Sequence, residues 1–388
     1  MSDTHAHSVA FVRETMLPQQ PPPVTEAGVV KWMRENLFKG WFNTLLTLVS
    51  LYFIFKIVTG AYPWFANGIW NTSSLAECRD MLDGMTGACF SVLTERWNQL
   101  LFGFTYPRDA YWRPTLAFVL LIVAIAPVLY PKAPRNLLYF TAVYPFLAYW
   151  LIWGGTLLIP LMVLVGLVAG YFAFKQFERQ SFAMGMIAGL VAAVVVIWAG
   201  SIVPASMPNV MAIEAVQSRD IGGFMLNMIL GTVCVSLSLP LGIMLALGRQ
   251  SSMPIIKWIC IIFIEFIRGV PLITLLFVAN VVLAYFFPPG SNIDLVLRVI
   301  IMITMFSSAY IAEVIRGGLA ALPRGQYEAA NSLGLDYAQS MRLIILPQAL
   351  KILIPGIVNV AAGLFKAPTL GSVISMFDPV GMLRGSLF

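Results

Sequence analysis

Charged side chains are scarce in this chain. Only 11% of its 388 residues are Asp, Glu, Lys or Arg, which is less than half of the share that soluble proteins carry. The remaining polar side chains are too few to cover a globule of this size with a water-facing surface. This scarcity argues against a soluble enzyme, a disordered chain and a nucleic-acid-binding protein. The net charge of +6 does not argue for nucleic-acid binding, because Lys and Arg placed beside membrane spans produce the same excess of positive charge.

Residue sets for intramembrane or nucleotide chemistry are missing as well. The two histidines, His5 and His7, both precede the first apolar segment, and the apolar segments contain no nucleophile–base or metal-ligand set. The sequence contains no Gly-Lys dipeptide and therefore no P-loop that could bind ATP. We expect no catalytic residue, no metal site and no cofactor in this chain.

Long apolar runs are what the chain does have. The 39 residues between Arg135 and Lys175 carry no charge. As one helix they would measure about 58 Å, whereas the core of a bilayer is about 30 Å thick. Two helices that meet near Gly154 and Gly155 fit this length instead.

The same counting predicts an all-α polytopic integral membrane protein with about nine transmembrane helices. The segments are uniformly apolar rather than alternating, which favours helices over a barrel. The predicted spans cover residues 42–58, 114–130, 137–153, 156–174, 181–200, 223–247, 269–287, 296–315 and 346–365.

Lys and Arg in short loops predict the orientation of these spans. The basic loops all fall on one side if the N-terminus is cytoplasmic, and they hold Lys132, Arg135, Lys175, Arg179, Arg249, Lys257, Arg316, Arg324 and Arg342. Residues 1–40, with a Pro-rich stretch from Pro18 to Pro23, then form a cytoplasmic tail, and residues 60–112 face outward. We expect no signal peptide, because the first apolar run begins after residue 40.

A change in composition at residues 204–222, where Pro, Gly and charged residues gather, predicts a boundary between two membrane modules. Residues 41–203 would form the first module and residues 222–388 the second. No internal duplication of the kind found in secondary transporters relates the two.

Four cysteines divide into two kinds. Cys78 and Cys89 lie in the predicted outer loop, where an oxidising compartment permits a disulfide. A bridge would close a short loop and stabilise it by about 3 kcal/mol in the chain-entropy model, and two unpaired thiols are the alternative. Cys234 and Cys260 lie in apolar stretches and are expected to be packing residues.

Charged residues also occur within or beside the predicted spans. Glu265 and Arg268, and likewise Glu313 and Arg316, are three residues apart, so each pair can meet on one helix face. Such a pair is either a local ion pair at the membrane interface or part of a gate or coupling site.

A predicted helix break favours the second of these interpretations. Arg268 is followed by Gly269, Val270 and Pro271. Pro271 starts a helix better than it continues one, and it pushes the residue before it out of the helical region. Broken helices at membrane depth usually line a cavity.

Residues 316–347 contain the strongest local pattern. A helix is expected from Gln326 to Leu333, with Gly334 as its stop and Asp336 as the cap of a second short helix that runs towards Pro347. Two short helices with a fixed bend would form a compact knob. An interfacial loop without a partner is the alternative.

The surface of this knob suits docking into a groove of another protein. Glu328 offers a charge, and Ala329 and Ala330 offer a surface thin enough for close approach.

These residues resemble the EAA loop of ATP-binding-cassette (ABC) importer permeases, in the polar amino-acid branch of that family. The loop residues that match are Glu328, Ala329, Ala330, Gly334, Ile344, Leu346 and Pro347. The flanking segments that match are Arg268–Leu272, Ala309–Gly318, Pro323–Gln326 and Leu346–Ala349. The resemblance covers about residues 222–375.

The resemblance implies a type I-like ABC permease core in the C-terminal half, within an importer of the bacterial inner membrane. A periplasmic binding protein would deliver a polar L-amino acid, two permease chains would form the path, and separate ATP-binding subunits would hydrolyse ATP. The extra N-terminal spans and the outer loop, with Cys78, Cys89, Arg96 and Trp97, resemble the long permeases for general, or acidic and amide, L-amino acids.

The resemblance also implies residue roles. The residues that couple the permease to the ATPase would be Glu328, Ala329, Ala330, Gly334, Ile344, Leu346 and Pro347. The gate or translocation path would fall to Arg268, Gly269, Pro271, Leu272, Glu313 and Arg316.

Two departures from the family pattern lead to an alternative. Lys366-Ala367-Pro368-Thr369-Leu370 stands where the family usually has Lys-Asp-Thr-Ser/Thr-Leu. The run from Gly371 to Phe388 is too short and interrupted for the final span of the family core. The alternative is a truncated, transport-inactive membrane partner that still binds the ATPase.

A third hypothesis is an ion-coupled secondary transporter. It would need carboxylates near the middle of the bilayer, and the two candidates, Glu265 and Glu313, fall near span ends.

Overall fold

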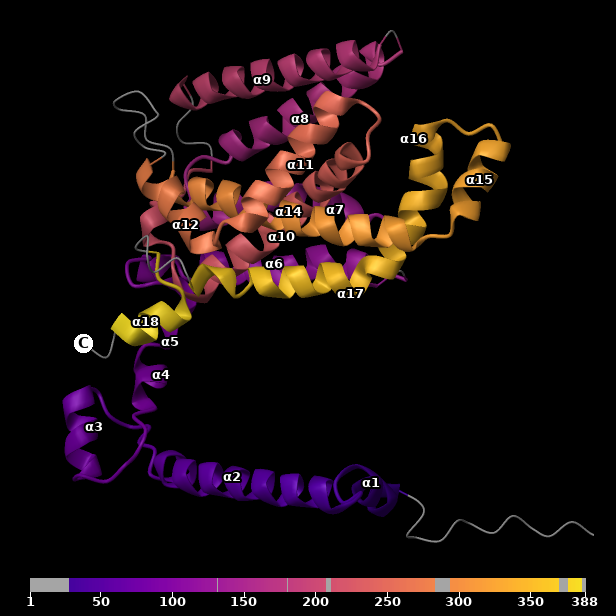
Figure 1. The fold of residues 1–388 in the computed structure, drawn as a ribbon. Coiled ribbons are helices and arrows are strands. Elements are labelled where there is room, and N and C mark those ends of the chain that lie inside the picture. Colours follow the sequence, from indigo (N-terminus) through magenta and orange to yellow (C-terminus); the bar gives the residue numbers. More distant parts are fainter. Residues whose placement is uncertain are drawn as a thin grey trace, which may run out of the picture. The chain divides into compact units, whose positions relative to one another are not determined.

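The computed structural model describes residues 28–130, 132–179, 181–206, 211–282, 294–369 and 376–385. Within these ranges the chain is helical, and its β-type pairing is limited to two isolated bridges. The chain divides into two compact units, residues 1–91 and residues 92–388, which are described separately (Figure 1).

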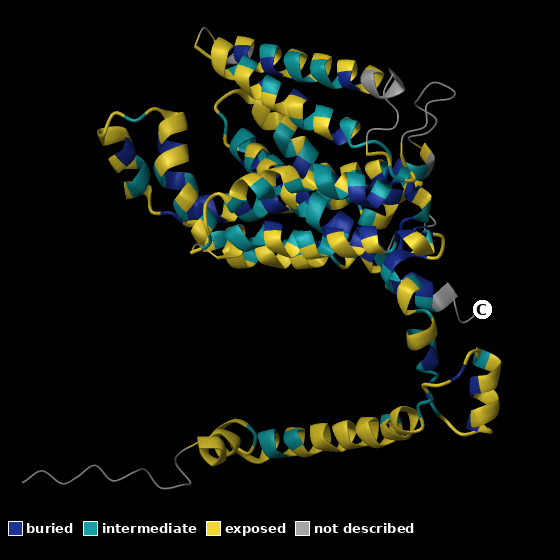
Figure 2. Cartoon of the chain, turned by 180° about the vertical axis from the view of Figure 1, so that it is seen from behind, coloured by how far each residue is buried: buried dark blue, intermediate teal, exposed yellow. Residues whose placement is uncertain are grey.

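Two helices begin the first unit, α1 (Gly28–Asn36) and α2 (Trp41–Ala66). The 26 residues of α2 measure about 39 Å, long enough to cross a bilayer core. No side chain of α2 is buried within the chain (Figure 2), as expected of a helix that faces lipid. Helix α1 lies within the residues 1–40 for which a cytoplasmic tail is predicted, and the Pro-rich stretch of that tail lies outside the described residues.

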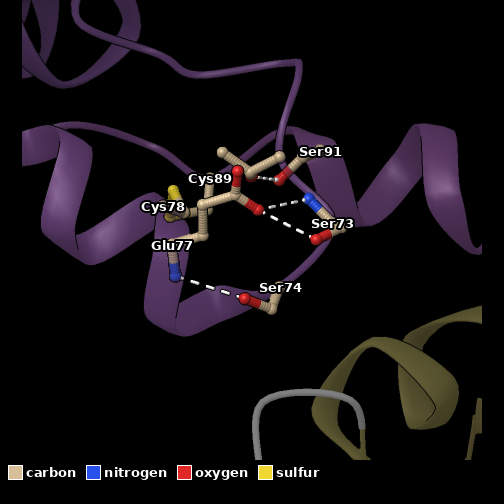
Figure 3. The surroundings of a disulfide bond; sticks show 7 residues. Ser73, Ser74, Glu77, Cys78, Cys89 and Ser91 are labelled. Atoms are coloured by element: carbon tan, nitrogen blue, oxygen red, sulfur yellow. Dashed lines mark hydrogen bonds between the residues drawn. A yellow bond between two sulfur atoms is a disulfide. The ribbon is translucent and has the colours of Figure 1, made fainter.

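A disulfide holds the rest of the first unit together. It joins Cys78, in α3 (Leu75–Leu82), to Cys89, so the bridge considered for these residues is present (Figure 3). The Ile69 amide donates to the Ala88 carbonyl oxygen at 2.9 Å. The segment between α2 and α4 is therefore a small folded unit rather than an open loop.

Polar contacts fix the start of α3. The Ser74 side chain accepts from the Glu77 amide, and the Glu77 carboxylate accepts from the amide and the hydroxyl of Ser73, both at 2.9 Å. These hydrogen bonds from Ser73 lower the pKa of Glu77 below 4.5, because they favour the ionised carboxylate.

The second unit carries the remaining helices. They are α4 (Ser91–Glu95), which begins at its border, α5 (Trp97–Phe102), α6 (Trp112–Leu129), α7 (Leu137–Trp153), α8 (Leu158–Phe177), α9 (Phe182–Ser206), α10 (Gly223–Arg249), α11 (Pro254–Gly269), α12 (Leu272–Phe277), α14 (Leu295–Ala321), α15 (Arg324–Ser332), α16 (Tyr337–Ser340), α17 (Leu346–Leu364) and α18 (Pro379–Gly385).

Each of the nine predicted spans corresponds to a helix or a helix pair in the described residues. Seven helical stretches are long and apolar enough to cross a membrane alone. The eighth candidate is the pair α11 and α12, which is bent by 101°. The ninth is α7, which is apolar but has only 17 residues. The all-helical membrane fold is thereby confirmed.

Small residues bring α8 and α9 together. A Cβ atom on Gly170 would lie only 2.7 Å from the Gly189 carbonyl oxygen, and one on Gly189 only 2.9 Å from that of Gly170. Close backbone approach of this kind is how helices associate in lipid, where no hydrophobic force drives them. The loop of Lys175 and Arg179 thus joins an antiparallel hairpin.

One apolar cluster joins the two modules that the sequence predicts. It contains Ala117 of α6, Leu151 of α7, Leu226 of α10 and Val299 of α14. The Arg113 guanidinium donates to the Glu214 carbonyl oxygen at 2.7 Å. The region around residues 204–222 therefore connects helices that pack in one core, and both predicted modules extend into the second compact unit.

The C-terminal segment lies against the start of α10. The Gly223 amide donates to the Phe377 carbonyl oxygen at 2.9 Å. Asp378 is almost fully buried and accepts from the Thr369 hydroxyl and the Gly381 amide, both at 2.8 Å. The described part of residues 371–388 contains only the short helix α18, and Leu370 lies outside the described residues.

Candidate functional site

A short helix, α15, stands out from the end of the second unit where α14 and α17 meet (Figure 1). Pro323 precedes it in an extended conformation. Its end is a Schellman motif, in which the Leu335 amide donates to the Ala330 carbonyl oxygen and the Gly334 amide to that of Asn331. Gly334 has φ +72°, a left-handed conformation that glycine adopts without strain. The predicted stop at Gly334 is confirmed.

The helix after the bend is longer than the sequence predicts. Asp336 forms the expected cap, a capping box with Gln339. However, α16 continues through a π-helical stretch, Met341–Ile345, directly into α17. The second helix of the knob is therefore not short. Pro347 does not end it, because Pro347 occupies an early position of α17, where the missing N–H of proline is tolerated.

The exposed surface of this region differs in one respect from the expectation. Glu328 and Ala329 are exposed, but Ala330 is fully buried, so Ala330 supports α15 instead of forming its docking surface. Two large apolar side chains nearby are exposed: Leu333 is 73% exposed and Tyr337 is 60% exposed.

The remaining residues predicted for coupling lie past the bend. Ile344 and Leu346 are half-buried, and Pro347 is exposed.

The base of α15 is tied to the membrane helices on both sides. Gln348 of α17 donates from Nε2 to the Gln326 Oε1 atom at 2.9 Å. Leu322, just before α15, shares an apolar cluster with Leu319 of α14 and Ile345. A displacement of α15 is therefore transmitted to α14 and α17.

The loop itself is shorter than the expected range of 316–347. Helix α14 continues through Arg316 to Ala321, and the Leu353 side chain of α17 packs directly over Gly318. The segment between membrane helices consists of residues 322–336.

A cluster of charged residues joins α10, α11 and α14. Its centre is Glu313, whose carboxylate accepts from Arg316 Nε at 2.8 Å and from Arg249 Nη1 at 3.4 Å. Arg268 Nη1 lies 3.7 Å from the same carboxylate. Arg249 also donates to Glu265 Oε1 at 2.9 Å. Three guanidinium groups thus surround two carboxylates.

This arrangement corrects one of the two predicted pairs. Glu313 and Arg316 do pair within α14. Glu265 and Arg268 do not pair with each other, since Glu265 binds Arg249 of α10 and Arg268 binds Glu313 of α14. From the sequence, Arg249 indicates only the orientation of the spans; its place at the end of a long apolar helix is the signal for this role.

The predicted helix break lies beside this cluster. Helix α11 ends at Gly269, Val270 and Pro271 are extended, and α12 begins at Leu272. The prediction of a break before Leu272 is confirmed. The Arg268 guanidinium lies 5.6 Å from the centre of the Tyr310 ring, a cation–π distance.

The charged cluster sets the positions of helices relative to one another. Within the ranges that the structure describes, no three His, Cys, Asp or Glu side chains gather as a metal site. The ion pairs hold three membrane helices at one relative position, and the coupling segment continues directly from α14. A bent span, a charged contact between helices and an exposed helix at the end of the bundle define a membrane-embedded component of a transport system.

Comparisons with known proteins identify the class. Residues 238–384 match the family model described as a binding-protein-dependent transport system inner membrane component, and the chain belongs to this family of ABC permeases. It is 50% identical over 98% of its length to the glutamate/glutamine/aspartate/asparagine transport system permease protein BztC of Rhodobacter capsulatus, covering 88% of that protein.

Two further relatives have related descriptions. The inner membrane amino-acid ABC transporter permease protein YhdY of Escherichia coli is 36% identical over 93% of this chain, which covers 83% of that protein. A crystal structure of an amino acid ABC transporter with histidines has 36% identity and a TM-score of 0.35, over 39% of this chain and 69% of that one. BztC and YhdY are both described as permease proteins, so they give no support to the transport-inactive alternative.

Proposed function

We propose that this chain is a permease subunit of an ABC importer and lines the path by which polar L-amino acids enter the cell. The observation that carries the proposal is the exposed, ordered helix α15, tied at its base to α14 and α17 by Leu322 and Gln348. The family membership and two relatives described as amino-acid transport permeases support it.

In this proposal α15 docks into a groove of a separate ATP-binding subunit. Glu328 and Ala329 face outward and make the contact, while Ala330 and Gly334 hold the shape of the bend. Movement of the ATPase then shifts α14, on which Glu313 joins the charged cluster. ATP is bound and hydrolysed by the partner subunit and not by this chain.

The proposal includes the remaining partners and the orientation. A second permease chain completes the path, and a periplasmic binding protein delivers the substrate. The N-terminus and α15 lie on the cytoplasmic side of the bacterial inner membrane, as the basic loops favour. The substrate class follows the 50% identical relative, whose description names glutamate, glutamine, aspartate and asparagine.

The test is reconstitution in proteoliposomes with the cognate ATPase, the partner permease and the binding protein. We expect ATP-dependent uptake of radiolabelled glutamate or glutamine and stimulation of ATP hydrolysis by the loaded binding protein. Assembly of the full complex without uptake of any of the four amino acids would refute the proposal and favour the transport-inactive alternative.

A further inference from the structure

A cavity of about 580 Å³, lined by both apolar and charged side chains, lies between the N-terminal helices and the permease core. Its walls come from Trp153 at the end of α7, the segment 216–219 before α10, Asn280 after α12, and Asp294 and Arg298 at the start of α14. Its volume falls in the range of small-molecule sites. Helices on both sides of the 204–222 region contribute to it, so the cavity depends on the extra N-terminal spans.

This cavity is far from the coupling segment. It lies at the first turn of α14, and α15 follows the last turn of the same helix. The 27 residues of α14 span about 40 Å, which is more than a bilayer core. If α15 faces the cytoplasm, the cavity opens on the side where a binding protein delivers its substrate.

The charges of the lining are unusual for the end of a membrane helix. Arg219 and Arg298 contribute two guanidinium groups, and Asp294 contributes one carboxylate. Among the described residues neither arginine forms an ion pair within 4 Å. The Arg298 Nε atom is buried without a hydrogen-bond partner there, and unsatisfied buried donors are costly.

The polar groups are also held in place. Arg298 Nη1 donates to the Asn280 carbonyl oxygen at 3.2 Å, which leaves Nε free. The Asp294 Oδ1 atom caps α14 by accepting from the Leu297 amide at 3.1 Å, and its Oδ2 atom has no hydrogen-bond partner among the described residues. Trp153 donates from its indole to the Ser218 hydroxyl at 2.7 Å.

We propose that this cavity is a binding site for an acidic α-amino acid on the permease itself. The two guanidinium groups bind the α-carboxylate and the side-chain carboxylate, and Asp294 binds the ammonium group. The cavity carries a net charge of +1 from these three residues, which complements the −1 charge of glutamate or aspartate. Arg–carboxylate hydrogen bonds are among the strong ones in proteins, so the amide analogues bind more weakly. The proposal rests on the proposed function for its substrate class.

The test measures saturable binding of radiolabelled L-glutamate to the purified full-length chain in nanodiscs, without the binding protein. We expect Arg298→Gln and Arg219→Gln each to weaken binding by about tenfold or more, because each removes a charged hydrogen bond. Asp294→Asn keeps the helix cap, since Asn also caps helices, and is expected to weaken binding similarly. L-Glutamine should compete at least about tenfold less well than L-glutamate.

Two control variants locate the site. Arg135→Gln makes the same charge change at the opposite end of α7 and should leave binding unchanged. Arg179→Gln makes the same charge change at an exposed position after α8 and should also leave binding unchanged. Each variant is compared by size-exclusion profile and thermal unfolding, so that misfolding is recognised; Arg219 lies in a loop, where substitution disturbs packing least.

Three results would overturn the proposal: no saturable glutamate binding by the wild-type chain, binding that persists in both Arg298→Gln and Arg219→Gln, or a phospholipid that co-purifies in the cavity and excludes glutamate. Uptake by the complete importer is measured in parallel. Uptake without binding to the isolated chain refutes this site and leaves the proposed function standing, whereas failure of uptake refutes the function itself.

Discussion

Arg249 and Glu313 are 64 residues apart in the sequence, yet Arg249 Nη1 donates to Glu313 Oε2 at 3.4 Å. This ion pair joins the end of α10 to the C-terminal third of α14, and the Glu313 side chain is only 23% exposed. Because Glu313 also contacts Arg268 and Arg316, its removal would leave three guanidinium groups facing one another with only Glu265 nearby.

Glu313→Gln should therefore weaken coupling between ATP hydrolysis and uptake. Charged hydrogen bonds contribute about 1.5–3 kcal/mol each, so we expect uptake by the reconstituted complex to fall about tenfold. Glu265→Gln is the matched control, since Glu265 is 53% exposed and forms one ion pair among the described residues, with Arg249. Exposed pairs contribute little, and its effect should be about twofold or less. Equal losses in both variants would contradict the central role of Glu313.

Glu328→Lys should uncouple transport while membrane insertion stays intact. Glu328 is exposed on α15, so reversing its charge alters a docking contact and disturbs no packing within the chain. Uptake and co-purification of the ATPase are the measurements. Glu178→Lys, the same reversal on another exposed residue, should transport normally, and wild-type uptake by Glu328→Lys would remove the coupling role.

Gly334 offers a test of the bend. Its φ of +72° is compatible with glycine, and a Cβ atom there would meet no neighbour within 4 Å. Gly334→Ala therefore adds backbone strain of about 1 kcal/mol, whereas Gly334→Asn tolerates this conformation better. Gly334→Pro also removes the N–H that bonds Asn331.

We expect ATPase co-purification to decrease in the order Asn, Ala, Pro. Gly325→Ala is the matched control, because this glycine of α15 also has open space around it but no positive φ. If all three Gly334 variants bind the ATPase as well as the wild type, the shape of the bend is irrelevant to docking.

The disulfide between Cys78 and Cys89 should protect the segment after α2 from proteases. In the chain-entropy model a loop of this size is stabilised by about 3 kcal/mol. Cys78→Ala with Cys89→Ala should increase the rate of cleavage between residues 67 and 91 about a hundredfold when cleavage follows local opening. Cys260→Ser, which changes a free cysteine, should show the wild-type rate. An unchanged rate in the double variant would show that other contacts hold this segment.

Local signals predicted much of this structure. Apolar run lengths predicted the nine helical segments, Pro271 predicted the break, and Gly334 and Asp336 predicted the bend, because each depends on a few adjacent residues. The partner of Glu265 could not be predicted in this way. Arg249 reaches it across 16 positions, so the pairing depends on how α10 and α11 pack.

Burial was also beyond local reasoning. Ala330 is as small as Ala329, and only the packing of α15 shows that one is buried and the other exposed. The shared core of α6, α7, α10 and α14 could not be predicted either, because a change in composition at residues 204–222 says little about which helices pack together.

The helical run from Tyr337 to Leu364 has a consequence for motion. Its π-helical stretch, Met341–Ile345, lies where α16 turns into α17 (Figure 1), and Pro355 lies inside α17. Helices bend at π-helical stretches and at prolines. The run is therefore an elbow and not a straight rod, so a movement applied to α16 can change the angle of the elbow without shifting the whole of α17.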